Sequence, residues 1–309
     1  MKVFNPPFAR PLTEAEVARL CGDGTRAATD ALAADIGLAP DLVGLIHEAG
    51  RDLDLSSLMP QLEGIFIPER WQESVDRLTL RTRRDQSGMT ILAIYLRCLN
   101  VTRRRYADFG LPDRTFRDTM GFFPRMLEAY RSAHGRVWFD EANWAVRQVS
   151  LTLLRIDELE FEFIGGDSPR VDLHIPSDAS LEAADLARTF AAFRTFLKDH
   201  CPAWTEAAVH CESWLLDPGL DELLPQRSRI RVFRGLFHVE GLQWADDFRE
   251  WTAGRTDLAD ADLPERTSLQ RAIKRHLLAG GRMGVGKGVL IPQAVSALDG
   301  RGDLARPAQ

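Results

Sequence analysis

Apolar residues in the first part of the chain recur at the spacing of helices. LTEAEVARL carries a capping box, because Thr13 and Glu16 can each accept a hydrogen bond from the other's backbone amide, and it predicts a helix that starts near Glu14. Pro40 and Pro68 stand where the first turns of further helices are expected. The segment MTILAIYLRCLNV predicts a buried helix of a bundle, with one apolar stripe formed by Ile91, Ile94, Cys98 and Val101.

The pattern changes after Gly135. Asp140 is expected to cap a helix over EANWAVRQVSLTLL. Strict alternation in LEFEF, residues 159–163, predicts a strand with one buried face. The turn residues GGDSP separate it from a second predicted strand, RVDLHI, at residues 170–175, so the two strands are expected to form a hairpin.

A helix and another strand follow this hairpin. LEAADLARTFAAFRTFL has the apolar stripe of a long helix that packs on a sheet. AAVHCESWLL, residues 207–216, is expected to be the next strand, which makes a βαβ unit with parallel strands. TSLQRAIKRHLLAGG predicts a helix with a capping box formed by Thr267 and Gln270, and GVLIPQ predicts a final strand.

These elements divide the chain into two expected domains. Its 309 residues are enough for two. A helical N-terminal domain is expected over residues 1–135, and an α+β or α/β domain with a mixed sheet over residues 136–295. The polar segment 296–309 is expected to be a flexible tail.

GRMGVGKG, residues 281–288, has the spacing Gly-x-x-x-x-Gly-Lys of a phosphate-binding P-loop, with Gly288 in place of the Ser or Thr that binds magnesium. A P-loop follows a strand and opens a helix, because a helix N-terminus attracts phosphate. Here a helix is expected before the motif and a strand after it, and a helix C-terminus repels anions. We therefore expect no nucleoside triphosphatase, and we expect the glycines to cap the helix and turn into the last strand.

Composition and charge exclude several classes of function. The chain is 45% hydrophobic and 27% charged, as in folded globular proteins, and its formal net charge of −6 disfavours nucleic-acid binding. Two basic clusters, RTRR at residues 81–84 and TRRR at residues 102–105, are expected to be solvated helix faces. No apolar run is long enough to span a membrane and no signal peptide is expected, so we expect a cytoplasmic protein with no membrane partner.

The four cysteines show no CxxC spacing and are expected to be reduced. The nearest approach to a metal motif is His200-Cys201 followed by His210-Cys211. If the second pair lies on a strand, its two side chains point to opposite faces and do not easily bind one ion. We therefore expect no metal site.

Several segments together resemble one family. They are LHIP at residues 173–176, SWLLDP at residues 213–218, SRI followed by Phe233, and LPERTSLQRA at residues 263–272, with GLPDRTFRDTM and LLRIDELEFEF before them. The family is that of bacterial acyltransferases with a helical N-acyltransferase N-terminal domain and a GNAT-like C-terminal domain, and the resemblance covers most of the chain. It implies an N-acyltransferase that uses acyl-CoA or acetyl-CoA as co-substrate, needs no metal and acylates a small-molecule substrate.

The resemblance also implies where acyl-CoA binds. In GNAT domains the fourth and fifth strands part, the pantetheine arm lies between them, and the helix after the fourth strand points its N-terminus at the pyrophosphate. RVDLHIP matches the fourth strand, LEAADLARTF the start of that helix and VHCESWLL the fifth strand. The residues implied to contact acyl-CoA are Ile175, Pro176, Ser177, Asp178, Ala179, Ser180 and Trp214. This loop lacks the glycines usual in GNAT domains, and Asp178 and Glu182 would repel a pyrophosphate.

Strand alternation sorts the candidates for catalysis. It places His174 beside Asp172 on one face of the first strand, and Glu212 beside His210 and Trp214 on one face of the second. His174 or Glu212 is the expected base that deprotonates the amine. The alternatives are a histidine hydrogen-bonded at a strand end and a glutamate in a structural ion pair.

An acid is also needed to protonate the departing thiolate. GNAT enzymes often use a tyrosine, but all three tyrosines here lie in the helical part. The candidates are Cys211, Ser213 or a tyrosine of the helical domain. The leading function is direct acyl transfer from a thioester to an amine. The alternative is a non-catalytic GNAT-like module that binds a small ligand or a partner, which the acidic loop and the missing tyrosine favour.

Overall fold

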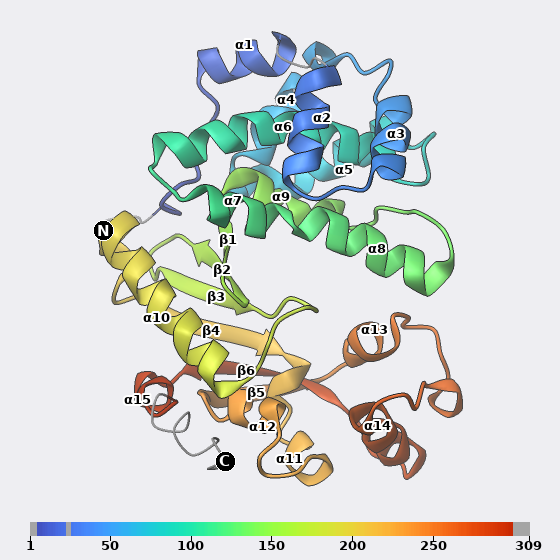
Figure 1. Ribbon diagram of the computed structural model, residues 1–309, viewed down its shortest axis with the longest axis vertical. Helices are drawn as coiled ribbons and strands as arrows, with labels where there is room; N and C mark the ends of the chain where they lie inside the picture. The colour runs from blue at the N-terminus through green and yellow to red at the C-terminus, as the bar shows by residue number, and fades with distance from the viewer. Residues whose placement is uncertain (1–4, 23–25, 299–309) are drawn as a thin grey trace, which may run out of the picture. The chain divides into compact units, whose positions relative to one another are not determined.

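The computed structural model describes residues 5–22 and 26–298 (Figure 1). Most of the predicted tail, residues 299–309, lies outside the described residues. The chain divides into two compact units, and the division falls between Arg155 and Ile156. Each unit buries its own set of apolar side chains.

The first unit is helical. Its elements are α1 (Glu14–Gly22), α2 (Arg26–Asp35), α3 (Pro40–Ala49), η1 (Leu55–Leu58), α4 (Met59–Ile65), η2 (Pro68–Arg70), α5 (Trp71–Thr82), α6 (Met89–Asp108), α7 (Asp113–Met120), α8 (Phe122–His134) and α9 (Ala142–Ser150). Helix α6 contacts α1, α2, α3, α5, α7 and α9, and all four residues of its predicted stripe are buried. The predicted helical bundle is therefore confirmed, with α6 at its centre.

Helix α9 ends earlier than predicted. Its N-cap is Glu141, not Asp140, and the helix stops at Ser150. Leu151 has a φ of 61°, its amide donates to the carbonyl of Gln148, and the amide of Thr152 donates to the carbonyl of Arg147. This is the Schellman geometry that usually has glycine at its left-handed position. Because Leu occupies that position here, the sequence prediction missed the stop, and the predicted helix was wrong over LTLL.

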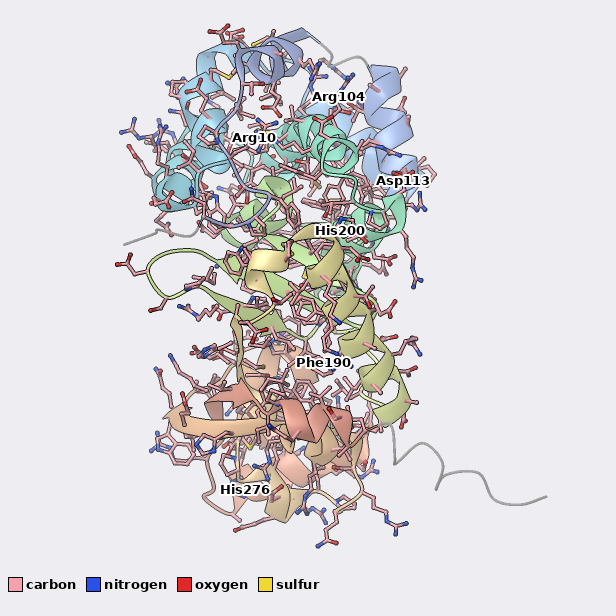
Figure 2. The ribbon with its side chains drawn as sticks, turned by 90° about the vertical axis from the view of Figure 1, so that its left-hand side faces the viewer. Arg10, Arg104, Asp113, Phe190, His200 and His276 are labelled. Atoms are coloured by element: carbon pink, nitrogen blue, oxygen red, sulfur yellow. The ribbon has the colours of Figure 1, made fainter. Side chains whose placement is uncertain are left out.

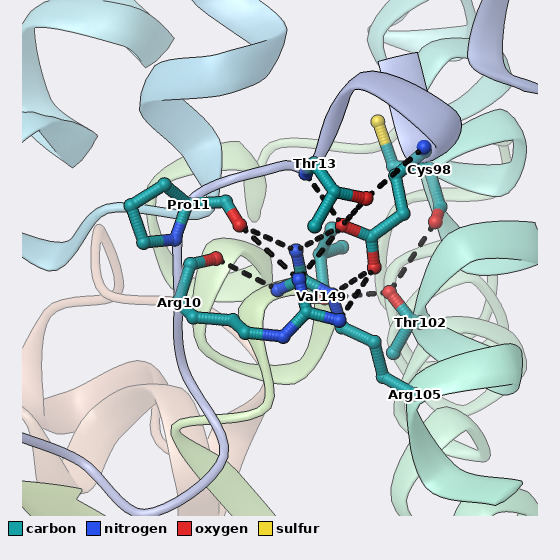
Figure 3. Close-up of polar contacts among 8 residues, drawn as sticks. Arg10, Pro11, Thr13, Cys98, Thr102, Arg105 and Val149 are labelled. Carbon is teal, nitrogen blue, oxygen red and sulfur yellow. Dashed lines mark hydrogen bonds and ion pairs between the residues drawn. The ribbon is translucent and has the colours of Figure 1, made fainter. Parts of the chain in front are cut away.

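One of the three arginines of the basic segment TRRR is buried, as is Thr102. Arg105 is 0% exposed, and its Nε donates to Glu16 Oε1 at 2.8 Å. Its terminal nitrogens donate to the carbonyls of Arg10 at 2.9 Å and Pro11 at 3.1 Å (Figure 3). Glu16 also closes the predicted capping box, accepting from the amide of Thr13 at 2.8 Å. The expectation of a solvated face is therefore wrong for Arg105, which joins the segment before α1 to α6.

The second unit contains the sheet. Its strands are β1 (Leu153–Ile156), which carries the division between the units, β2 (Leu159–Ile164), β3 (Arg170–His174), β4 (Ala208–Ser213), β5 (Phe237–Trp244) and β6 (Gly284–Leu290). Its helical elements are α10 (Ala183–His200), η3 (Pro202–Trp204), η4 (Trp214–Leu216), α11 (Leu220–Leu223), α12 (Arg229–Arg234), α13 (Phe248–Ala253), η5 (Asp260–Asp262), α14 (Ser268–Leu278) and α15 (Pro292–Ser296). Within the described residues, six strands form one sheet in the order β1-β2-β3-β4-β6-β5.

The sheet is mixed. Strands β2 and β3 form the predicted antiparallel hairpin, and β3 and β4 are parallel, joined through α10 as the predicted βαβ unit. Helix α10, which carries Phe190 (Figure 2), packs on β2: the rings of Phe193 and Phe161 stack with centroids 3.8 Å apart, and Phe190 meets Phe161 edge-on. The predicted mixed-sheet domain after a helical domain is confirmed.

Three of the four glycines of GRMGVGKG, Gly284, Gly286 and Gly288, lie in strand β6. The α14 capping box of Thr267 and Gln270 is present, and Gly280 has the left-handed φ of 84° expected after the helix. The prediction of a turn into the last strand was wrong for these three glycines, because β6 already begins at Gly284, and of the four only Gly281 lies between α14 and β6. A Cβ on Gly286 would lie 2.8 Å from Leu216 Cβ, so the glycine allows η4 to pack flat against β6. The segment is therefore extended and has no P-loop geometry.

Strand β4 is shorter than predicted. It ends at Ser213, whose hydroxyl accepts from the amide of Leu215, and the chain then turns into η4. Asp217, only 1% exposed, closes this turn by accepting from the amides of Gly219 at 2.8 Å and Gly284 at 2.7 Å. The sequence-based prediction assigned residues 214–216 to the strand, because three apolar residues in a row are compatible with a buried strand as well as with a turn of helix.

Candidate functional site

One face of the sheet carries ionisable side chains. In the parallel pairing of β3 with β4, Asp172 lies opposite His210. Because side chains alternate along a strand, His174 and Glu212 project from the same face as that pair. The structure thus brings the two predicted bases to one face at the ends of neighbouring strands.

Two glutamates of β2 join this face, and the sequence analysis missed both. Glu160 lies opposite His174 and Glu162 opposite Asp172. They are 3% and 4% exposed, so LEFEF is buried on both faces and the prediction of one buried face was wrong. The signal was present in the hairpin, because its register sets the glutamates of LEFEF opposite the polar residues of RVDLH.

His174 is held by one of these glutamates. Its Nε2 lies 2.9 Å from Oε2 of Glu162, and the side chains are 24% and 5% exposed respectively. A buried carboxylate requires hydrogen-bonding partners, and the imidazole is one of them. The pair therefore has a buried anion and a partly accessible imidazole, which is the arrangement that orients a catalytic histidine.

The pairing of β3 with β4 ends beside His174. Pairing between β3 and β4 ends at Leu173 and Cys211, although β3 continues to His174 and β4 to Ser213. Beyond that point β3 pairs with β2, through His174 and Glu160, and β4 pairs with β6. The β3–β4 pairing therefore ends next to His174, in the region where the GNAT resemblance expects these two strands to diverge.

Glu212 lies in a different environment from His174. Its carboxylate is 3.0 Å from Nζ of Lys287 on β6, and the two side chains are 54% and 58% exposed. An exposed ion pair of this kind contributes little to stability. The lysine of the P-loop-like motif is thus a surface partner of Glu212, and the ion-pair alternative for this glutamate applies.

The two candidate acids lie on the opposite face. Cys211 is 2% exposed and is paired with Leu173, and its burial raises the pKa of the thiol, helped by the charges of Asp172 and Glu212. A thiol with a raised pKa gives up its proton poorly. Ser213 uses its hydroxyl to accept from the amide of Leu215 at 3.2 Å. The structure therefore does not bring either residue together with His174.

The loop implied to contact acyl-CoA forms a turn before α10. The amide of Ala179 donates to the carbonyl of Pro176 at 3.0 Å, and the amide of Ser180 donates to Glu158 at 2.8 Å. Pro176 is buried, Ser177 and Asp178 are exposed, and Ile175, Ala179 and Ser180 are half-buried. Trp214, also assigned to acyl-CoA, is 9% exposed and lies in η4 rather than on β4.

Residues 5–22 and 26–298 contain neither a metal-binding cluster nor a membrane-spanning helix. No group of three or more His, Cys, Asp or Glu side chains there is placed to hold a metal ion. His200 ends α10 and His210 lies within β4, and burial raises the pKa of the neighbouring Cys201 to about 12. None of the helices in these ranges is long and apolar enough to span a bilayer.

Comparisons with known proteins agree with this fold. A family model described as a GNAT-like C-terminal domain matches residues 135–290, and one described as an N-acyltransferase N-terminal domain matches residues 26–151. A search of curated proteins found no significant match.

Three solved structures are similar in fold. A mutant acyltransferase in complex with octanoyl-CoA has a TM-score of 0.66 at 19% identity, over 91% of this chain and 89% of that chain. An acyltransferase in complex with decanoyl-CoA has a TM-score of 0.62 at 21% identity, over 85% of this chain and 98% of that chain. An acyltransferase in complex with decanoyl-CoA and teicoplanin has a TM-score of 0.59 at 20% identity, with the same coverage. With the two matched domains in this order, the chain belongs to the acyltransferase family that joins an N-acyltransferase N-terminal domain to a GNAT-like C-terminal domain.

Proposed function

We propose that this protein transfers an acyl group from an acyl-CoA thioester to an amine of a small-molecule acceptor. The similar solved structures hold octanoyl-CoA or decanoyl-CoA, and one holds teicoplanin as well. Their shared fold supports an acyl-CoA donor and a small-molecule acceptor. The domain described as an N-acyltransferase supports an amine as the group that accepts the acyl chain.

The end of the pairing between β3 and β4 supports a binding place for the pantetheine arm. Paired strands use their backbone amides and carbonyls on each other, whereas separated strand ends can pair with an extended ligand. Pantetheine contains two amides and is extended, so it suits the ends of β3 and β4 beyond Leu173 and Cys211. A thioester at the end of the arm would then lie near His174.

His174 is the proposed base. With Glu162 accepting a hydrogen bond from Nε2, the imidazole is held in the tautomer whose Nδ1 accepts a proton. The buried carboxylate also stabilises the imidazolium that forms once the proton has been taken. A base in this position contributes about 100-fold to 10,000-fold to the rate.

Acyl transfer by this route forms no covalent intermediate on the protein. The amine nitrogen forms a bond to the thioester carbonyl carbon, the carbon–sulfur bond breaks, and the sulfur leaves with its electron pair as a thiolate. His174 takes the proton that the amine loses. Because Cys211 and Ser213 lie on the other face, we propose that the same imidazolium returns this proton to the thiolate.

The observation that carries the proposal is the buried Glu162 paired with a partly accessible His174, at the point where the pairing of β3 with β4 ends. The test measures release of CoA thiol from acetyl-, octanoyl- and decanoyl-CoA with a panel of primary amines, and identifies the amide product by mass spectrometry. His174→Asn should lower kcat by about 100-fold or more while the protein stays folded.

His238→Asn is the matched control, because His238 is exposed on β5 and has no place in the proposed reaction. The proposal fails if His174→Asn and His238→Asn turn over acyl-CoA equally. It also fails if the folded wild-type protein consumes no acyl thioester with any amine.

One observation favours the alternative of a non-catalytic binding module. The amide of Ser180, in the loop assigned to the pyrophosphate, already binds the carboxylate of Glu158. A non-catalytic module would bind an acyl-CoA or a small ligand, detected by calorimetry, without releasing thiol. His174→Asn would then bind the ligand as the wild type does, and neither protein would turn over acyl-CoA.

A further inference from the structure

The turn between β1 and β2 is bound to the first half of α10. The amide of Glu158 donates to the hydroxyl of Thr189 at 3.4 Å, and this hydroxyl, on a residue that is 0% exposed, donates to the carbonyl of Asp185 at 2.8 Å. Arg188 of α10 lies 3.5 Å from the carboxylate of Glu158 and 3.6 Å from that of Asp157. Backbone, hydroxyl and ionic contacts therefore hold the turn in one place.

From this turn Glu158 reaches the loop just before α10, two residues ahead of the N-cap Glu182. Its Oε2 accepts from the amide of Ser180 at 2.8 Å, and the hydroxyl of Ser180 donates to Asp185 at 2.6 Å. The hydrogen bond from Ser180, followed by that from Arg188, lowers the pKa of Asp185. Asp185 is therefore ionised at neutral pH, and two carboxylates occupy the polar groups of Ser180.

This arrangement does not fit a pyrophosphate. The start of a helix attracts anions because its unpaired amides carry partial positive charge. Here the carboxylates of Glu158 and Asp185 already lie around Ser180 in front of the helix, and a pyrophosphate bound there would lie close to both of them. The cation of the network, Arg188, is already shared between Glu158 and Asp185.

We propose that Glu158 takes the place that the donor's pyrophosphate occupies in GNAT domains, so that this protein selects its donor by the acyl chain and the pantetheine arm. This inference rests on the proposed function, because it specifies the donor of that reaction. The donor class is then acyl-pantetheine thioesters in general, and the nucleotide half of CoA adds little to recognition.

The first test compares two donors on the wild-type protein. Octanoyl-CoA and S-octanoyl-pantetheine should give kcat/KM values within about fivefold of each other. In a separate calorimetric measurement, 3′-phospho-ADP, which is the nucleotide half of CoA, should not bind at about 1 mM. A preference for octanoyl-CoA above that factor, or micromolar binding of 3′-phospho-ADP, would overturn the inference.

The second test removes the charge of Glu158. Glu158→Gln keeps an oxygen that can accept from Ser180 but leaves the helix start open to an incoming anion. The ratio of kcat/KM for octanoyl-CoA to that for S-octanoyl-pantetheine should rise by about fivefold or more. Glu206→Gln, which changes an exposed carboxylate beyond the opposite end of α10, should leave the ratio unchanged.

If folded Glu158→Gln shows the same ratio of kcat/KM values as the wild type, the inference is overturned. If this variant does not fold, the two measurements on the wild-type protein decide. The outcome is separable from that of the proposed function. Binding of octanoyl-pantetheine as tight as that of octanoyl-CoA, without turnover of either, would support the inference and refute the reaction. Turnover that depends strongly on the nucleotide half would do the reverse.

Discussion

Replacing Glu16 with Gln should destabilise the helical unit to an extent that depends on pH. Burial alone would raise the pKa of Glu16, but the hydrogen bonds from Arg105, the amide of Thr13 and Arg10 outweigh burial and lower the pKa from 4.5 to about 2. Because the pKa is lower in the folded state, the carboxylate stabilises the fold above pH 4.5. This contribution is lost as the pH falls from 4.5 towards 2.

The magnitude follows from the two pKa values. A fall from 4.5 to about 2 corresponds to about 3 kcal/mol of unfolding free energy at pH 7, of which about 2 kcal/mol remains at pH 3.5. The neutral amide of Glu16→Gln also leaves Arg105, which is 0% exposed, without its carboxylate. Loss of one partner from a buried pair costs about 3–5 kcal/mol in total.

The assay is urea-induced unfolding followed by far-ultraviolet circular dichroism at pH 7 and pH 3.5. The difference in unfolding free energy between wild type and Glu16→Gln should shrink by about 1 kcal/mol between the two pH values. Glu14→Gln, an exposed change in the same first turn, should alter stability by less than about 0.5 kcal/mol at either pH. A difference for Glu16→Gln that stays constant or widens at pH 3.5 would show that its ionised form is not what stabilises the fold.

Two further predictions concern the α/β unit and the cysteines. In a thermal unfolding measurement, Gly286→Ala should lower the free energy of unfolding by about 1–3 kcal/mol, because its Cβ would lie 2.8 Å from Leu216. The control Gly241→Ala meets no atom within 4 Å and should change stability little. Equal effects of the two variants would contradict the packing argument. Iodoacetamide should label exposed Cys21 well before Cys98, Cys201 and Cys211, because burial raises the pKa of those three thiols, and early labelling of Cys211 in a peptide map would contradict this.

The features that the sequence predicted correctly depend on neighbouring residues. The capping boxes of Thr13 and Thr267, the buried stripe of α6 and the hairpin of β2 and β3 are each written within a short segment. The same holds for the common face of His174 and Glu212, which needs only strand alternation and the βαβ connection.

The features that could not be predicted from the sequence depend mostly on residues far apart in the chain. Arg105 is buried because its partners are Arg10, Pro11 and Glu16, and β6 can be a strand of glycines because η4 packs on it. The pairing of Glu162 with His174 is the exception, because both residues belong to one hairpin and only its exact register was needed to find them. Long-range partners override local propensity at the other positions, and a pattern search along the chain does not contain that information.

The order of strands in the sheet bears on how the protein is made. Among the described strands β6 comes last in the sequence, so it is synthesised after both β4 and β5, yet it lies between them. While a ribosome extends the chain from Ser213 to Gly284, a matter of seconds, β4 presents an unpaired edge, and β5 has no neighbour among the described strands. The nascent α/β unit therefore depends on β6 to join β5 to the rest of the sheet, so interruption of translation before β6 would leave β4 and β5 with unpaired edges that are prone to aggregation.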